Sequence, residues 1–166
     1  MKILHTSDWH IGRTFHKNQT LEALETVFEA LVQLVSANQV DVVVAAGDIF
    51  DSTTPSAQAV KLLDTFLLNI TYAGAKVVLT SGNHDSPERL GARAVFARQA
   101  GVHVLTETDT IASPVTIDDE SGPVHFYPLP YIEPAHQRHV WTTADSMRSQ
   151  KDAMKFALDL VRADWN

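Results

Sequence analysis

The chain has 166 residues, of which 45% are hydrophobic and 20% charged, a composition typical of a globular protein with a sizeable core. It has no cysteine, which excludes disulfides, thiolate zinc sites and cysteine nucleophiles. The formal net charge of −7 argues against a domain that holds nucleic acid by a basic surface alone. We expect a cytoplasmic protein for two reasons. The N-terminal apolar run does not fit a signal peptide, because it is short and Asp8 interrupts it. No stretch has the roughly 20 apolar residues of a membrane span.

Predicted strands and helices alternate from the N-terminus. Residues 2–6 form a short apolar strand of the kind that is buried in the middle of a sheet. Apolar residues at helical spacing predict an amphipathic helix over residues 19–38. The run DVVVAA then predicts a buried strand over residues 41–46. Thr54 before Pro55 is typical of a helix cap followed by a first-turn proline, and we expect this second helix to end near Gly74.

The alternation continues through residue 105. A third buried strand is predicted over residues 76–80. Ser86 before Pro87 predicts a third helix that ends near Gly101, before a short strand over residues 102–105. This order predicts the α/β class, with parallel strands and helices on both faces of the sheet.

The pattern changes after Thr106. Two strands, over residues 111–117 and 124–127, are predicted to pair in antiparallel fashion through an acidic turn around Ser121. Prolines between residues 128 and 134 indicate a loop, and a last helix is predicted over residues 143–164.

A polar cluster follows each of the first three strands: SDWH at residues 7–10, GDIFD at residues 47–51 and GNHD at residues 82–85. The carboxyl ends of parallel strands meet at one edge of a sheet, so we expect the three clusters to converge there. In extended chain, Asp8 and His10 would project to the same side. Taken alone, Asp8 could cap a turn and His10 could be a surface histidine. The three motifs together favour a shared site.

The side chains of this site are ligands for divalent metals. Carboxylate, imidazole and amide groups from Asp8, His10, Asp48 and Asn83 suit Mn²⁺, Mg²⁺, Fe²⁺ or Zn²⁺. Asp48 follows the central strand and is placed to bridge two cations, which can activate a water and clamp a phosphate. We expect the glycines at 47 and 82 to let the chain turn sharply after each strand.

In this order and spacing, SDWH, GDIFD and GNHD resemble the first three signature motifs of the calcineurin-like dinuclear metallophosphoesterases. The longer stretches LHTSDWHIGR, GDIFDSTTPS and SGNHDSPERL are similar to the SbcD-type DNA-repair nucleases, a branch of that family. The resemblance runs through YPLPYIEP and implies a four-layer α/β sandwich. Residues 1–166 would then be the N-terminal part of a single nuclease domain, incomplete at the C-terminus.

The resemblance also implies roles for individual residues. Asp8 and His10 would bind the first metal, Asp48 would bridge both metals, and Asn83 would bind the second. His84 would be the non-ligand histidine that stabilises or protonates the leaving oxygen, which suits an imidazole near neutral pH.

Other polar residues would support this site. Two carboxylates are expected to orient the ligands without binding metal, namely Asp51 and Asp85. Four cations near the site loops are candidates for contacts with DNA phosphates, and solvated surface charge explains each equally well. These cations are Arg13, Lys17, Arg89 and Arg93.

The resemblance to the SbcD-type nucleases implies Mn²⁺-dependent cleavage of DNA, exonucleolytic on duplex ends and endonucleolytic on single strands. The resemblance further implies a homodimer and an SMC-like ATPase partner of the SbcC type. Family members continue with three more ligand histidines, partly in a G-H-x-H motif, and nothing after Asp85 matches them. We therefore expect a truncated or naturally short form with an incomplete second metal site. Alone, it should bind Mn²⁺ weakly and show little or no nuclease activity.

Two other functions remain open. The acidic net charge favours a phosphodiesterase or phosphatase that acts on a small phosphoester. The missing histidines favour a non-catalytic interaction module, although such a module has no physical need for the intact ligand set.

Overall fold

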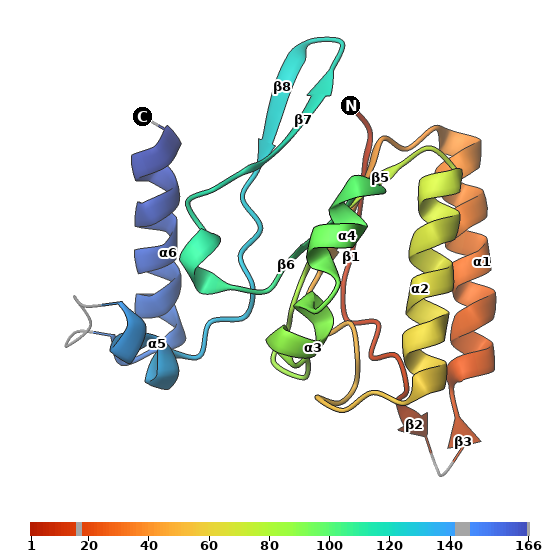
Figure 1. Ribbon diagram of the computed structural model, residues 1–166, viewed down its shortest axis with the longest axis horizontal. Helices are drawn as coiled ribbons and strands as arrows, with labels where there is room; N and C mark the ends of the chain where they lie inside the picture. Colours follow the sequence, from red (N-terminus) through yellow and green to blue (C-terminus); the bar gives the residue numbers. More distant parts are fainter. Residues whose placement is uncertain (16–17, 142–146, 166) are drawn as a thin grey trace. The chain divides into compact units, whose positions relative to one another are not determined.

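The computed structural model describes residues 1–15, 18–141 and 147–165, and the chain divides into two compact units (Figure 1). Unit 1 is Met1–Thr106 and unit 2 is Glu107–Asn166. The expectation that both belong to a single domain stays a prediction. Unit 1 contains, in chain order, β1 (Ile3–Thr6), β2 (Thr14–Phe15), β3 (Asn18–Gln19), α1 (Leu21–Asn38), β4 (Val42–Ala46), α2 (Ala57–Tyr72), β5 (Lys76–Thr80), α3 (Pro87–Gly91), α4 (Ala94–Gln99) and β6 (Val102–Leu105). Unit 2 contains the 3₁₀ turn η1 (Thr108–Thr110), β7 (Val115–Asp119), β8 (Gly122–Phe126), α5 (Pro134–Val140) and α6 (Gln150–Trp165).

Unit 1 is built on a parallel sheet in the order β1-β4-β5-β6, which confirms the predicted α/β class. Each new strand is added on the same side of the previous one, so right-handed crossovers return every connecting helix to the same face. Val43, Val77 and Leu79 of that face are buried in one cluster with side chains from α1, α2, α3 and α4. The expectation of helices on both faces is therefore wrong for the described helices of unit 1.

The strands and helices of unit 1 differ from the prediction in three details. β1 is the outermost strand of the described sheet and Ile3 is 51% exposed, so this strand is not the buried central strand expected. The N-cap of α2 is Ser56, whose Oγ accepts from the backbone N–H of Ala59 at 3.2 Å, rather than Thr54. The third helix is interrupted after Gly91, a poor helix former, and continues as the separate helix α4.

Unit 2 consists of a β-hairpin and two helices. The antiparallel pairing of β7 with β8 is confirmed, although β7 begins four residues later than predicted. Helix α5 occupies part of the predicted loop, because Pro134 suits a first helical turn and Glu133 caps it through the backbone N–H of Ala135.

The last helix, α6, starts at Gln150 rather than at residue 143. Ser149 accepts from the backbone N–H of Asp152, and the Asp152 carboxylate accepts from the Ser149 hydroxyl, which is the pattern of a helix start. Residues 142–146 of the prediction lie outside the described residues. None of the described helices is long and apolar enough to cross a membrane.

Candidate metal centre

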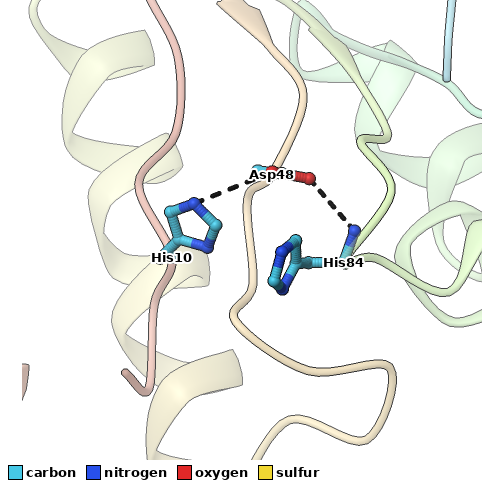
Figure 2. Close-up of side chains that lie close together, drawn as sticks. All are labelled: His10, Asp48 and His84. Carbon is cyan, nitrogen blue, oxygen red and sulfur yellow. Dashed lines mark hydrogen bonds and ion pairs between the residues drawn. The ribbon is translucent and has the colours of Figure 1, made fainter. Parts of the chain in front are cut away.

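The loops that follow β1, β4 and β5 meet at one edge of the sheet of unit 1. His10 in the first loop donates its backbone N–H to the carbonyl of Asp48 at 2.9 Å. His84 in the third loop donates its backbone N–H to Oδ1 of Asp48 at 3.1 Å. Figure 2 shows Asp48 between the two histidines. The strand order explains this, since β4 lies between β1 and β5. The predicted convergence of the three clusters is confirmed.

The side chains of these loops bring metal-ligand atoms together. One ligand atom each from His10, Asp48 and His84 lies within 4.8 Å of the other two (Figure 2). Nε2 of His10 is 3.7 Å from Oδ2 of Asp48 and 3.9 Å from Oδ1 of Asp8. Two imidazoles and a carboxylate at this spacing suit a divalent transition metal such as Mn²⁺, Fe²⁺ or Zn²⁺.

Asp51 contacts both histidine rings of this cluster. Its Oδ1 lies 3.1 Å from Nδ1 of His10, a buried atom that has no aligned hydrogen bond. Its backbone carbonyl lies 3.3 Å from Nδ1 of His84. Both contacts are on the Nδ1 side of a ring, which leaves Nε2 as the nitrogen available to a cation or a substrate. The orienting role of Asp51 stays a prediction.

The backbone of the site is strained. Asp8, His10 and Asp48 have positive φ angles of 56°, 44° and 51°, in the left-handed region that residues with a Cβ rarely adopt. Asp8 and His10 therefore approach each other through left-handed backbone and not through the extended chain expected. Strain of this kind persists where surrounding contacts enforce it, and it is frequent at functional sites.

Backbone packing brings the second and third loops into contact. A Cβ at Gly82 would collide with the carboxylate and backbone nitrogen of Asp48, whereas Gly47 is required for its φ of +81°. Asp85 is 5% exposed and accepts the backbone N–H groups of Gly82, Ile49 and Phe50 at 2.8, 3.0 and 2.8 Å. Asp85 thus supports the site by holding its loops, and it does so through backbone groups.

The other predicted metal ligands lie in the same loops. Asn83 is exposed between Gly82 and His84, and its role as a ligand stays a prediction. The structure also brings His84, which was expected not to bind metal, into the group of ligand atoms. Ser7, to which the motif assigned no role, donates its hydroxyl to the carboxylate of Asp8. No spacing in the sequence signals that contact, because a contact between adjacent side chains depends on the local backbone conformation.

The four candidate DNA contacts have different surroundings. Arg13 and Arg89 are exposed. The Nη1 of Arg93 lies 2.9 Å from Oδ2 of Asp64 on α2, so its charge is partly neutralised. Lys17 lies outside the described residues. Contacts of these side chains with DNA stay a prediction.

Comparison with known proteins agrees with this geometry. A model of the family Calcineurin-like phosphoesterase matches residues 1–151, a stretch that includes all three loops of the candidate metal centre. The parallel sheet, its helices and the separate antiparallel pair are consistent with the fold of that family. The chain therefore belongs to the calcineurin-like phosphoesterases, enzymes that bind divalent metals and hydrolyse phosphoesters.

Proposed function

We propose that this chain belongs to an SbcD-type nuclease that hydrolyses phosphodiester bonds in DNA. Membership of the phosphoesterase family supports the reaction class. The observation that carries the proposal is the convergence of His10, Asp48 and His84 from three separate loops. Our first candidate for the cofactor is Mn²⁺, bound at two sites by Asp8, His10, Asp48 and Asn83. The motif wording, which is similar to that of the SbcD-type nucleases, favours DNA as the substrate.

The geometry suggests what each residue does in this reaction. Bound divalent cations would neutralise phosphate charge and lower the pKa of an attacking water. Asp48 is held by the His84 backbone N–H, so its Oδ2 stays directed at His10. The contact of His84 Nδ1 with the Asp51 carbonyl leaves Nε2 to give a proton to the leaving oxygen.

The first test is Mn²⁺ titration by calorimetry on the 166-residue chain. We expect weak binding, with an affinity that falls about tenfold or more in Asp48→Asn, since the substitution removes the central charge but keeps the side-chain shape. The matched control is Asp118→Asn, an exposed residue of β7. An absence of binding at millimolar Mn²⁺ would contradict the proposal and favour the interaction module.

The second test compares substrates for the 166-residue chain. Blunt duplex DNA, single-stranded circles and a chromogenic phosphodiester are incubated with Mn²⁺. We expect the chain to cleave both DNA forms slowly and to be slow on the chromogenic ester as well. Turnover of the chromogenic ester without DNA cleavage would favour the small-phosphoester enzyme, the alternative that the net charge of −7 supports.

Two partners follow from the same similarity and are part of the proposal. The nuclease would act as a homodimer and would associate with an SMC-like ATPase of the SbcC type. Sedimentation of the chain, alone and with that ATPase, tests both. A strictly monomeric protein that does not bind the ATPase would contradict both partners. Only the proposed hydrolysis of phosphodiester bonds in DNA would then remain.

A further inference from the structure

Unit 1 contains a cavity of about 320 Å³ that none of the residues His10, Asp48 and His84 lines. It lies between α2 on one side and α3 and α4 on the other, above residues of β5 and β6. Its volume is within the range of small-molecule sites, which are about 300–1,000 Å³. Because every lining residue belongs to unit 1, the cavity is a property of that unit alone.

The interior of the cavity is apolar. Leu63, Leu79 and Val102 line it and are at most 5% exposed. Ala94 and Ala97 form the wall on the side of α4, and their small side chains leave space that a leucine would fill. Burial of an apolar ligand body against this surface is therefore favourable.

The polar side chains that line the cavity carry a net positive charge. They are Asp64, Arg89 and Arg93. Asp64 and Arg93 form an ion pair at 2.9 Å and neutralise each other. Within the described part of the chain, the guanidinium of Arg89 has no ion pair or hydrogen bond. It adds one positive charge at the cavity of a chain whose net charge is −7. A guanidinium binds carboxylate, sulfonate or phosphate oxygens in a paired geometry.

We propose that this cavity binds a small amphipathic anion. The apolar body of the ligand lies between α2 and α4, and its single anionic group contacts Arg89. The site is separate from the candidate metal centre, and the proposal does not depend on the substrate of the enzyme.

The test uses the fluorescent probe anilinonaphthalene sulfonate and its uncharged analogue phenylnaphthylamine, each titrated into the 166-residue chain. Ala97→Leu fills the cavity and should weaken the binding of both probes about tenfold or more. Ala100→Leu, at an exposed position just after α4 that does not line the cavity, should leave both affinities unchanged. Circular dichroism shows whether each variant is folded.

Arg89→Gln tests the charge without changing the cavity wall. It should weaken binding of the sulfonate about fivefold and leave the uncharged probe unaffected. Arg98→Gln on α4, which does not line the cavity, should change neither affinity. The proposal is overturned if Ala97→Leu and Ala100→Leu bind the probes equally. It is also overturned if Arg89→Gln affects the sulfonate no more than Arg98→Gln does.

Discussion

At the scale of single residues, Asp48 combines several tasks in one position. It has a left-handed backbone, accepts the backbone N–H of His84 and directs its second carboxylate oxygen at His10. The space beside the Asp48 side chain admits only a glycine at position 82. Any Cβ at Gly82 would meet the Asp48 carboxylate.

We therefore predict that Gly82→Ala lowers the free energy of unfolding by about 3 kcal/mol and greatly weakens Mn²⁺ binding. The colliding atoms include backbone, which cannot move away cheaply. Gly74→Ala is the matched control: it has a φ of +96° and nothing within 4 Å. The free energy of unfolding of Gly74→Ala should fall by about 1 kcal/mol because of backbone strain alone, and its affinity for Mn²⁺ should be unchanged. Urea denaturation and calorimetry measure both quantities, and equal effects of the two variants would contradict the collision.

His103 in β6 gives a prediction about pH. Burial lowers its pKa, and the charges of Arg98 and Lys76 lower it further, so the folded state favours the neutral ring. Between this lowered pKa and the ordinary value of about 6.5, the unfolded chain binds more protons than the folded one. Stability should therefore fall as pH drops through that window. His103→Gln should remove this part of the pH dependence, and the exposed His136→Gln should not. Denaturation curves at several pH values give the free energy of unfolding as a function of pH. Identical slopes of this free energy against pH in both variants would contradict the role of His103.

At the scale of secondary-structure elements, the site depends on how two loops are held after β4 and β5. The carboxylate of Asp85 accepts three backbone N–H groups that have no place in the sheet. We predict that Asp85→Asn costs about 2 kcal/mol of stability, because its amide group leaves at least one buried N–H without an acceptor. Mn²⁺ affinity should fall as well, since His84 follows the displaced Gly82. Asp118→Asn serves as the control in urea denaturation. Unchanged stability in Asp85→Asn would refute the role of Asp85 in holding the two loops.

The start of α2 gives a second prediction at this scale. Ser56 caps the helix through the N–H of Ala59, whereas Thr54 interacts with Ser52 before the helix. Ser56→Ala should destabilise the protein by about 1 kcal/mol, and Thr54→Ala should have a much smaller effect. Chemical denaturation of the two variants side by side decides between the caps. A larger loss in Thr54→Ala would restore the cap expected from the sequence.

At the scale of the whole molecule, the ligand atoms of the candidate metal centre come from unit 1, whereas the family match extends to residue 151 in unit 2. Metal binding should stabilise the folded chain by mass action. At a tenfold excess of Mn²⁺ over its Kd, we predict a gain of about 1.4 kcal/mol and a higher Tm. EDTA should reverse the gain, and Asp48→Asn should not show it. A rise of equal size in that variant would mean that Mn²⁺ binds elsewhere.

Much of the fold could be predicted because strong local signals agree. β5 and β6 begin and end where the sequence indicates, since short valine-containing runs between turn residues leave little choice. Predicted boundaries are wrong where competing caps lie close together, as at Thr54 and Ser56, or where a poor helix former interrupts a helix, as at Gly91. The single face that the helices of unit 1 cover depends on strand order, which no local pattern encodes.

The sequence by itself determined the metal chemistry of this protein: three motifs, each after a strand of a parallel sheet, place carboxylate and imidazole groups at one edge. Only the tertiary structure decided how those groups are held. The positive φ angles at Asp8, His10 and Asp48 occur where the loops after β1 and β4 are hydrogen-bonded to each other, and the cavity beside α4 is lined by segments far apart in the chain. Residue type limits which chemistry is available, but the packing of distant backbone determines its geometry.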